Sequence, residues 1–329
     1  MGSSAATPGA VGGRLNQRKS VFIRRYGTLL APIALSIYFA LASSRFLTLG
    51  NFQSIIMEWT ILCTLALGFT FVVAAGEFDL SFGYLIALCS VVAALMINAG
   101  INVFLVILGV LAIGAAVGIL NSLLVVKVGL PAFIATIGVG ALCQGVNYLF
   151  SGAAPIAIFF GMLPRALEFI GQEYLFNLPS TLLVFVPISV LSIYCLTQTR
   201  IGRYIYAIGM NPVAAKRAGI NVGRGKTFAF VCCSVAAALV GLLITARSGS
   251  GQSIAGPEYL LDVFASVFFG MSLFKEGEAN AEGTMVGALF MVIVSNGLTL
   301  MNTPFYILKI LQGLVIFMSV SLTSRYKVQ

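Results

Sequence analysis

Residues 200–226 read RIGRYIYAIGMNPVAAKRAGINVGRGK and form the one long, polar, strongly basic interruption in an otherwise apolar chain. Within this stretch, residues 211–219 predict a short helix, with Asn211 as N-cap, Pro212 at the first helical position and Gly219 as terminator. A helix of about two turns is marginal in water by itself. A short, capped, basic helix between apolar segments therefore indicates a contact surface for a soluble partner.

The rest of the chain has the composition of an integral membrane protein. Hydrophobic residues make up 59% of the 329 residues and charged residues 9%, against about 25% charged in an average soluble domain. The mean hydropathy is +1.03. The net charge of +9 comes from basic residues that flank apolar segments without interleaved aromatics, so we expect membrane topology to explain it and expect no nucleic-acid partner.

Apolar runs of about 17 to 25 residues predict an all-α, polytopic transmembrane bundle of about ten spans. The runs lie at 27–43, 54–75, 82–99, 102–126, 132–150, 179–197, 227–246, 260–274, 284–301 and 305–323. We expect one transmembrane domain over 27–329, after a disordered, basic, cytoplasmic segment over 1–26. Two halves of comparable span content are compatible with inverted repeats. Two glycine pairs favour close helix approach: Gly114 with Gly118, and Gly283 with Gly287.

The distribution of Lys and Arg orients these spans. If the N-terminus is cytoplasmic, ten crossings return the C-terminus to the cytoplasm and place the 200–226 loop there too. Of the 19 Lys and Arg residues, all then fall on the cytoplasmic side except Arg45, Arg165, Arg247 and Lys309, the last of which lies inside the final span. A topology shifted by one helix would destroy this bias.

An acidic turn, Gly76-Glu77-Phe78-Asp79-Leu80-Ser81-Phe82-Gly83, joins the second and third spans. A charge well inside a bilayer costs at least ~2.5 kcal/mol, so such carboxylates normally face a bundle interior or a water-filled cavity. Two interpretations stay open. Either Asp79 or Ser81 caps the third span in a cytoplasmic turn, or the segment lines or shapes a translocation path.

The fifth span carries polar side chains into the membrane after a proline at its start. Thr136, Gln144 and Asn147 lie on this span, behind Pro131. Polar groups at such positions either hold helices together or contact a polar solute, and both interpretations stay open.

Motifs for metal binding, catalysis or nucleotide binding are missing from the sequence. Histidine is absent, and the six cysteines lie in apolar runs without metal-ligand spacing, so we expect no metal or cofactor in this chain. Residues 223–227 end like a phosphate-binding loop, but Ile220 stands where that loop requires glycine. An ATP-driven function would need an ATPase in another chain.

Four motifs, in the same order and spacing, resemble the permease subunits of bacterial ABC sugar importers of the ribose type, the membrane domain of type II importers. The resemblance covers nearly the whole chain from about Leu29 onward. Residues 76–83 are similar to the family's GGIDLSVG, Asn121 with residues 131–138 to N…PxFIATLG, residues 209–220 to GxNxxAAxxxGI, and residues 283–298 to GTxxGA…NNGL.

This resemblance implies a multi-pass, non-enzymatic permease of the bacterial inner membrane, which moves a sugar or sugar-like solute through the bilayer. Its implied partners are an ABC ATPase subunit that holds ATP and Mg, a periplasmic substrate-binding protein, and a second permease copy or a sister permease. The loop at 198–226 would contain the coupling helix, with Ala214 and Ala215 packed closely against the ATPase and Lys216 and Arg217 at its acidic rims. The implied coupling residues are Gly209, Asn211, Ala214, Ala215, Lys216, Arg217, Ala218, Gly219 and Ile220. The candidate pathway residues are Asp79, Ser81, Asn121, Phe133, Thr136, Gln144, Asn147 and Asn296.

Two departures from the family pattern keep alternatives open. Glu77 replaces a common glycine, and an acidic loop with Glu276, Glu278 and Glu282 stands where the family is rich in glycine. One alternative is a proton-coupled secondary transporter that uses Glu77 and Asp79. Another is an intramembrane enzyme, for which the chain offers acids but no recognisable pair of nucleophile and base.

Overall fold

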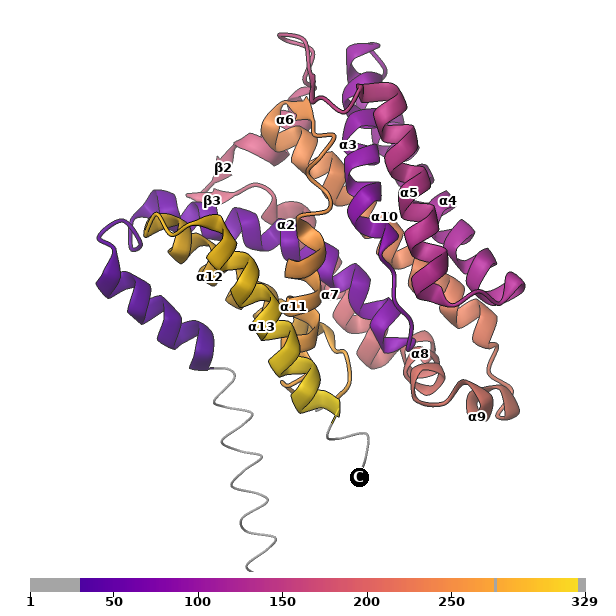
Figure 1. Cartoon of the computed structure of the whole chain (residues 1–329). Helices are drawn as coiled ribbons and strands as arrows, with labels where there is room; N and C mark the ends of the chain where they lie inside the picture. The colour runs from indigo at the N-terminus through magenta and orange to yellow at the C-terminus, as the bar shows by residue number, and fades with distance from the viewer. Residues whose placement is uncertain (1–29, 275–276, 325–329) are drawn as a thin grey trace, which may run out of the picture.

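The computed structural model describes residues 30–274 and 277–324 and consists mainly of helices (Figure 1). A first helix over Leu30–Ala42 is followed by α2 (Leu49–Ala74), α3 (Ser81–Asn98), α4 (Val103–Ser122), the π-helical segment η1 (Leu123–Val128), α5 (Ala132–Ser151), α6 (Arg165–Gln172), α7 (Leu182–Gln198), α8 (Arg200–Met210), α9 (Pro212–Arg217), α10 (Val222–Ser248), α11 (Tyr259–Gly270), α12 (Ala281–Leu300) and α13 (Phe305–Ser324). The predicted segment 1–26 lies outside the described residues.

Two antiparallel strand pairs brace the connections between helices. The strand β1 (Ile156–Ala157) pairs with β4 (Ser250–Gly251), and β2 (Tyr174–Leu175) pairs with β3 (Leu178–Pro179). The first pair ties the long 151–178 connection to the segment that follows α10.

Six of the described helices are long and apolar enough to cross a membrane: α2, α3, α4 with η1, α5, α10 and α12. The pair α7 and α8, bent by 68°, gives a seventh if it counts as one broken span. The prediction of an all-α, polytopic membrane protein is confirmed. Helix length does not support all ten predicted spans, because α11, with 12 residues, extends only about 18 Å against a hydrocarbon core of about 30 Å.

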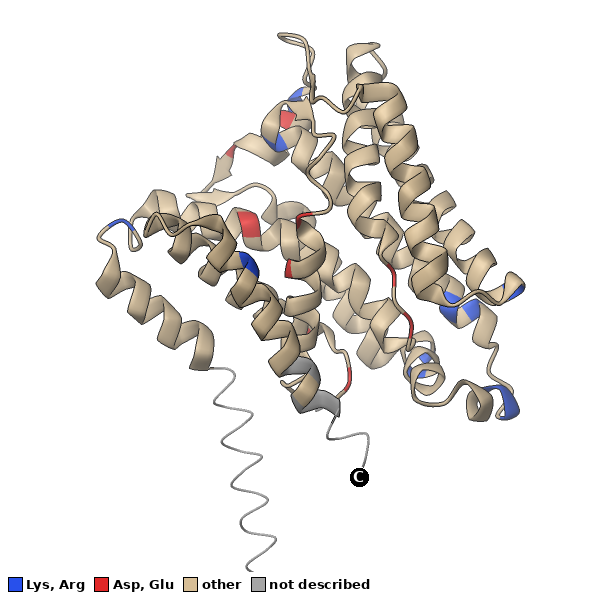
Figure 2. Cartoon of the chain, in the orientation of Figure 1, with Lys and Arg blue, Asp and Glu red and all other residues tan. Residues whose placement is uncertain are grey.

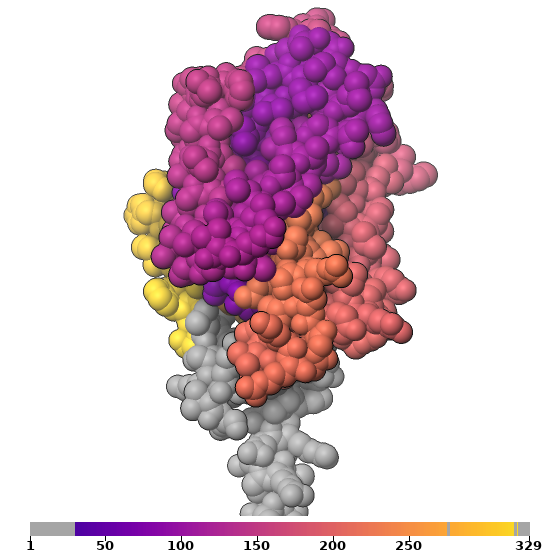
Figure 3. Space-filling model, turned by 90° about the vertical axis from the view of Figure 1, so that its right-hand side faces the viewer, coloured from indigo at the N-terminus to yellow at the C-terminus, as the bar shows by residue number. Residues whose placement is uncertain are grey.

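The helices α2 and α10 form the centre of the bundle. The most apolar window of α2 is 83% buried, whereas that of α4 with η1 is only 22% buried. The helix α10 packs against α2, α3 and α4, while α12 packs against α2 and α11. Figure 3 looks onto the outer helices α4 and α5, whose apolar outward faces form a broad surface.

Glycine makes two of the helix crossings close, as the sequence predicts. A Cβ added at Gly114 would lie 2.8 Å from the Ser234 carbonyl oxygen of α10. A Cβ at Gly287 would fall on the Ser266 carbonyl oxygen of α11, closer than any side chain tolerates. Residues larger than glycine would force α4 away from α10 and α12 away from α11.

Basic residues gather at one edge of the bundle (Figure 2). This edge carries α8, α9 and the C-terminal end of α13, whereas α6 lies at the opposite edge (Figure 1). The arrangement agrees with the charge asymmetry from which the topology is predicted. The predicted cytoplasmic positions Lys275, Arg325 and Lys327 lie outside the described residues.

Candidate functional site

The predicted capped helix in the basic loop is present as α9. The Asn211 side-chain oxygen accepts hydrogen bonds from the backbone amides of Val213 at 3.0 Å and Ala214 at 2.9 Å. The helix ends at Arg217, and Gly219, two residues further on, has a φ of +82° that suits glycine and turns the chain away. The Ile220 amide then donates back across the last turn at 3.0 Å. Local capping therefore defines both ends of α9.

The two faces of α9 have different surroundings. Ala215 is only 4% exposed and anchors the helix on its own chain. Val213, Ala214, Lys216 and Arg217 are exposed. Ala214 is therefore free to pack against a partner, as expected, whereas Ala215 is not, because it packs against its own chain. The face free for a partner is a patch of one valine, one alanine and two cations, which we call the α9 face: Val213, Ala214, Lys216 and Arg217.

The basic loop packs directly against the acidic turn. Gly209, near the end of α8, lies so close to the last residue of α2 that an added Cβ would fall on the Ala74 carbonyl oxygen. Gly76 lies opposite it, with a φ of +76°. Beyond α9, the Lys226 ammonium forms an ion pair with the Glu77 carboxylate. Sequence reasoning treated Lys226 as a topology anchor and missed this pair.

Four of the predicted pathway residues, all fully buried, form one hydrogen-bond network at the start of α3: Asp79, Ser81, Asn121 and Thr136. Asp79 accepts from the Ser81 amide at 2.8 Å and from the Ser81 hydroxyl at 2.6 Å. The Asn121 amide donates to the Ser81 hydroxyl oxygen at 2.7 Å and to Asp79 at 3.4 Å. Thr136 accepts from the Leu80 amide at 3.1 Å. The network holds the turn against α4 and α5. Leu80, and neither Asp79 nor Ser81, occupies the N-cap position of α3, so Asp79 fixes the turn through Ser81 and does not cap the helix in the standard way.

The electrostatics of this turn are set by burial. Asp79 lies between α2 and α3, outside both spanning helices, and desolvation raises the pKa of its carboxyl to about 6, while the hydrogen bonds from Ser81 oppose that rise. Burial therefore disfavours ionisation of this carboxyl, and the hydrogen bonds from Ser81 partly offset that cost.

Gln144 and Asn147 line a small cavity of about 100 Å³ between α3, α5 and the segment after β4. The Asn147 amide donates to the Ser253 carbonyl at 2.7 Å, and Gln144 donates to the Tyr148 hydroxyl at 2.9 Å. The Asn147 side-chain oxygen is buried without a hydrogen-bond partner. Phe133 is absent from the residues that line this cavity and is 58% exposed.

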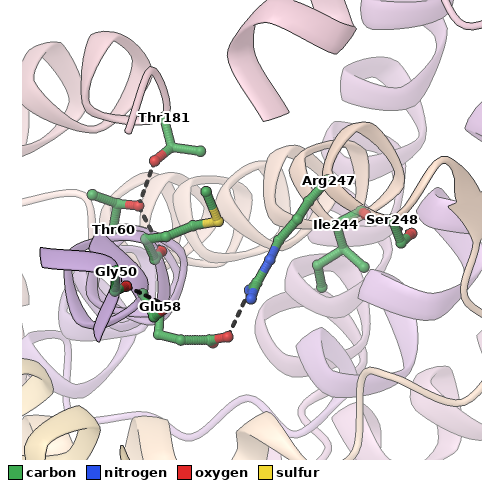
Figure 4. Close-up of polar contacts among 9 residues, drawn as sticks. Gly50, Glu58, Thr60, Thr181, Ile244, Arg247 and Ser248 are labelled. Atoms are coloured by element: carbon green, nitrogen blue, oxygen red, sulfur yellow. Dashed lines mark hydrogen bonds and ion pairs between the residues drawn. The ribbon is translucent and has the colours of Figure 1, made fainter. Parts of the chain in front are cut away.

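Asn296 lies apart from these residues, in a second cavity of about 230 Å³ between α2, α11 and α12. Its amide donates to the Asn51 side-chain oxygen at 2.8 Å. Glu58 lines the same cavity and pairs with Arg247 at the end of α10 at 2.6 Å (Figure 4). Sequence reasoning missed Glu58 because it is a single acid within an apolar span. The other polar lining residues are Ser54, Tyr259, Asp262, Ser295 and Thr299.

No group of three or more histidine, cysteine, aspartate or glutamate residues suited to a metal ion occurs in the part of the chain that the structure describes. The predicted pathway residues thus divide among the buried turn network, the α3–α5 cavity and the α2–α12 cavity, with Phe133 outside all three. The basic loop and the acidic turn meet at one edge.

The chain is similar to known permeases over most of its length. The family model for the permease component of branched-chain amino acid transport systems matches residues 51–320. The ribose import permease of Haemophilus influenzae is 32% identical over 299 residues, which cover 91% of this chain and 93% of that protein. The galactose/methyl galactoside import permease of Escherichia coli K12 is 31% identical over 318 residues, with 91% and 93% covered.

A third relative, the D-allose transport system permease of Escherichia coli K12, is 28% identical over 300 residues, with 90% of this chain and 91% of that protein covered. No solved structure matches the chain. The family model carries an amino acid transport name, whereas these three relatives are named for sugars. The chain belongs to the ribose-type family of sugar ABC importer permeases, which are transport subunits and not enzymes themselves.

Proposed function

We propose that this chain is the membrane-spanning permease of an ATP-driven importer for a sugar or sugar-like polar solute, and that residues 209–220 couple it to a separate ATPase. The observation that carries the proposal is the α9 face. Lys216 and Arg217 are exposed there on a helix whose other side is anchored through Ala215. A firmly seated helix that offers two cations and a small side chain fits an acidic cleft on a soluble partner.

The family supplies the remaining partners of this proposal. Two permease copies, or this chain and a sister permease, would form the channel in the bacterial inner membrane. A periplasmic binding protein would deliver the solute at the edge opposite α9, and the ATPase pair would hold ATP and Mg. Ten spans with both termini cytoplasmic remain the proposed topology, supported by the position of the basic residues (Figure 2).

Both cavities suit a neutral, hydroxylated solute. Their polar lining consists mainly of amides and hydroxyls, such as Asn147, Ser253, Asn296 and Thr299. In the larger cavity, the Arg247 guanidinium balances the charge of Glu58, and the Asp262 carboxylate accepts a hydrogen bond from the Gln312 amide. Amides, hydroxyls and carboxylates of this kind exchange hydrogen bonds with sugar hydroxyls. We propose that Gln144, Asn147 and Asn296 contact the solute on its path.

The test of the proposal reverses the charges of the α9 face. Lys216→Glu combined with Arg217→Glu leaves the Ala215 anchor in place, so we expect normal membrane insertion. Co-purification of the ATPase and the ATP hydrolysis stimulated by loaded binding protein should both fall. Lys127→Glu, which reverses an exposed charge at the same edge, serves as the matched control. Wild-type ATPase retention and stimulation in the double variant would refute the coupling role.

The proton-coupled alternative depends on Glu77 and Asp79. Glu77 is paired with Lys226, and Asp79 is enclosed by its hydrogen bonds to Ser81. Neither arrangement suits a carboxylate that must exchange protons with both sides of a membrane. Sugar uptake by proteoliposomes that contain this chain alone, driven by a pH gradient, would support the alternative.

A further inference from the structure

The ion pair between Glu77 and Lys226 joins two segments that are 149 residues apart in the chain. It is well shielded, since the side chain of Lys226 is 20% exposed and that of Glu77 17% exposed. By contrast, the Arg165 side chain is 76% exposed in its pairs with Glu168 and Glu173. A shielded pair is screened less by salt and holds its partners together more firmly than an exposed one.

Lys226 lies in the first turns of α10, immediately after the coupling segment. Only residues 218–221 separate the end of α9 from the start of α10, and Asn221 caps that start by accepting from the Arg224 amide at 3.0 Å. A displacement of α9 therefore reaches Lys226 through a short, capped connection with little slack.

Glu77 lies in the turn that leads into the buried network of Asp79 and Ser81. The basic loop contacts the turn at two points. At the first, the backbone of Gly209 packs against Gly76 and Ala74 with no room for a side chain. At the second, Lys226 holds the Glu77 carboxylate. The first contact resists compression, and the second resists separation, so the turn follows the loop in both directions.

We propose that Glu77 and Lys226 are positioning residues that transmit the movement of α9 to the Asp79 turn and the start of α3. The inference rests on the proposed coupling role of α9. It also gives a reason for Glu77, which stands where the motif it resembles has glycine. A displacement of α9 by the ATPase then reorients α3. Through Tyr84 and Ala87, α3 lines the same cavity as Gln144 and Asn147.

The test is a charge exchange in the complete complex, purified through a tag on this chain and reconstituted in proteoliposomes. Ribose, D-allose and galactose, each with the binding protein, serve as the solutes. Glu77→Lys and Lys226→Glu should each lower substrate-stimulated ATP hydrolysis and uptake by about fivefold or more, a factor typical of coupling between sites. The double exchange, which restores opposite charges, should recover at least about half of the wild-type stimulation.

Two further measurements separate this inference from a merely structural role. ATPase co-purification and basal ATP hydrolysis should stay at wild-type levels in all three variants, because the α9 face is unchanged. Lys127→Glu repeats the charge reversal of Lys226→Glu at an exposed position and should stimulate normally. Normal stimulation in both single variants, a double exchange as impaired as the single ones, or loss of the ATPase from them would overturn the inference.

The proposed function is tested separately, by the double variant of the α9 face. If Lys216→Glu with Arg217→Glu keeps full stimulation, the coupling role of α9 is wrong, whatever the exchange at Glu77 and Lys226 shows. If that variant loses stimulation and the charge exchange does not rescue, only the transmission step is wrong.

Discussion

Replacing Gly209 by alanine tests the contact between the basic loop and the acidic turn. Gly209 belongs to α8, and alanine in a helix interior is normally favoured over glycine by about 1 kcal/mol. Here the added Cβ would fall on the Ala74 carbonyl oxygen, which is a backbone atom that cannot rotate away. Overpacking of this kind costs about 1–3 kcal/mol, and subtracting the helix-propensity gain leaves a net loss of stability of up to about 2 kcal/mol.

The assay compares Gly209→Ala with Gly138→Ala in the purified complex. Gly138 also lies in a helix, but its added Cβ would meet open space, so this control reports the propensity gain alone. We expect Gly209→Ala to lower the thermal midpoint in detergent and the stimulated ATP hydrolysis, and Gly138→Ala to lower neither. A Gly209→Ala variant with wild-type stability and stimulation would refute the tight contact on which the loop's mechanical role depends.

Further predictions concern the buried network, the cavities and α9. Asp79→Ala removes the acceptor of two Ser81 hydrogen bonds and should destabilise the protein by about 1–3 kcal/mol, measured by thermal unfolding, whereas Asp79→Asn keeps an acceptor and should retain uptake; loss of uptake in both would favour a charge-dependent role. Because burial raises the pKa of Asp79 to about 6, its ionisation removes stability as the pH rises through that value. Asp79→Asn should therefore gain stability relative to the wild type between about pH 4 and pH 7, and a constant difference would contradict this. Arg247→Ala breaks a pair whose side chains are 36% and 41% exposed, so it should cost no more than about 1 kcal/mol; a larger loss in unfolding would show a structural role that exposure does not suggest. Ala215→Arg should abolish stimulated ATP hydrolysis while insertion persists, because it displaces α9 from its own chain; normal stimulation would show that this seat is dispensable.

Local signals in the sequence were sufficient for the ends of α9 and for the close helix crossings. Asn211, Pro212 and Gly219 act within one or two turns of chain, so their effect depends little on distant residues. Gly287 marks a close crossing for a similar reason, because the absence of a side chain is the property that matters there. Apolar length likewise predicts a polytopic helical protein, and six of the described helices, or seven with the bent pair α7 and α8, are long and apolar enough to cross a bilayer.

The arrangement of the candidate site depends on contacts that no local pattern encodes. The pair of Glu77 and Lys226 joins distant segments, and each residue alone reads as an ordinary charge near a membrane edge. The seat of Ala215 depends on what α9 packs against, which a two-turn helix does not reveal. Asn147 and Asn296 are both asparagines near the ends of predicted spans, yet they line different cavities.

The most direct test of the account is sugar uptake by proteoliposomes that contain the purified complex. With ATP and the ATPase on the α9 side and ribose, D-allose or galactose with binding protein on the other, we expect accumulation of at least one sugar in the compartment that holds ATP. Removal of ATP, or of the ATPase, should abolish it. Equal accumulation without ATP or the ATPase, driven by a pH gradient through this chain alone, would contradict the account.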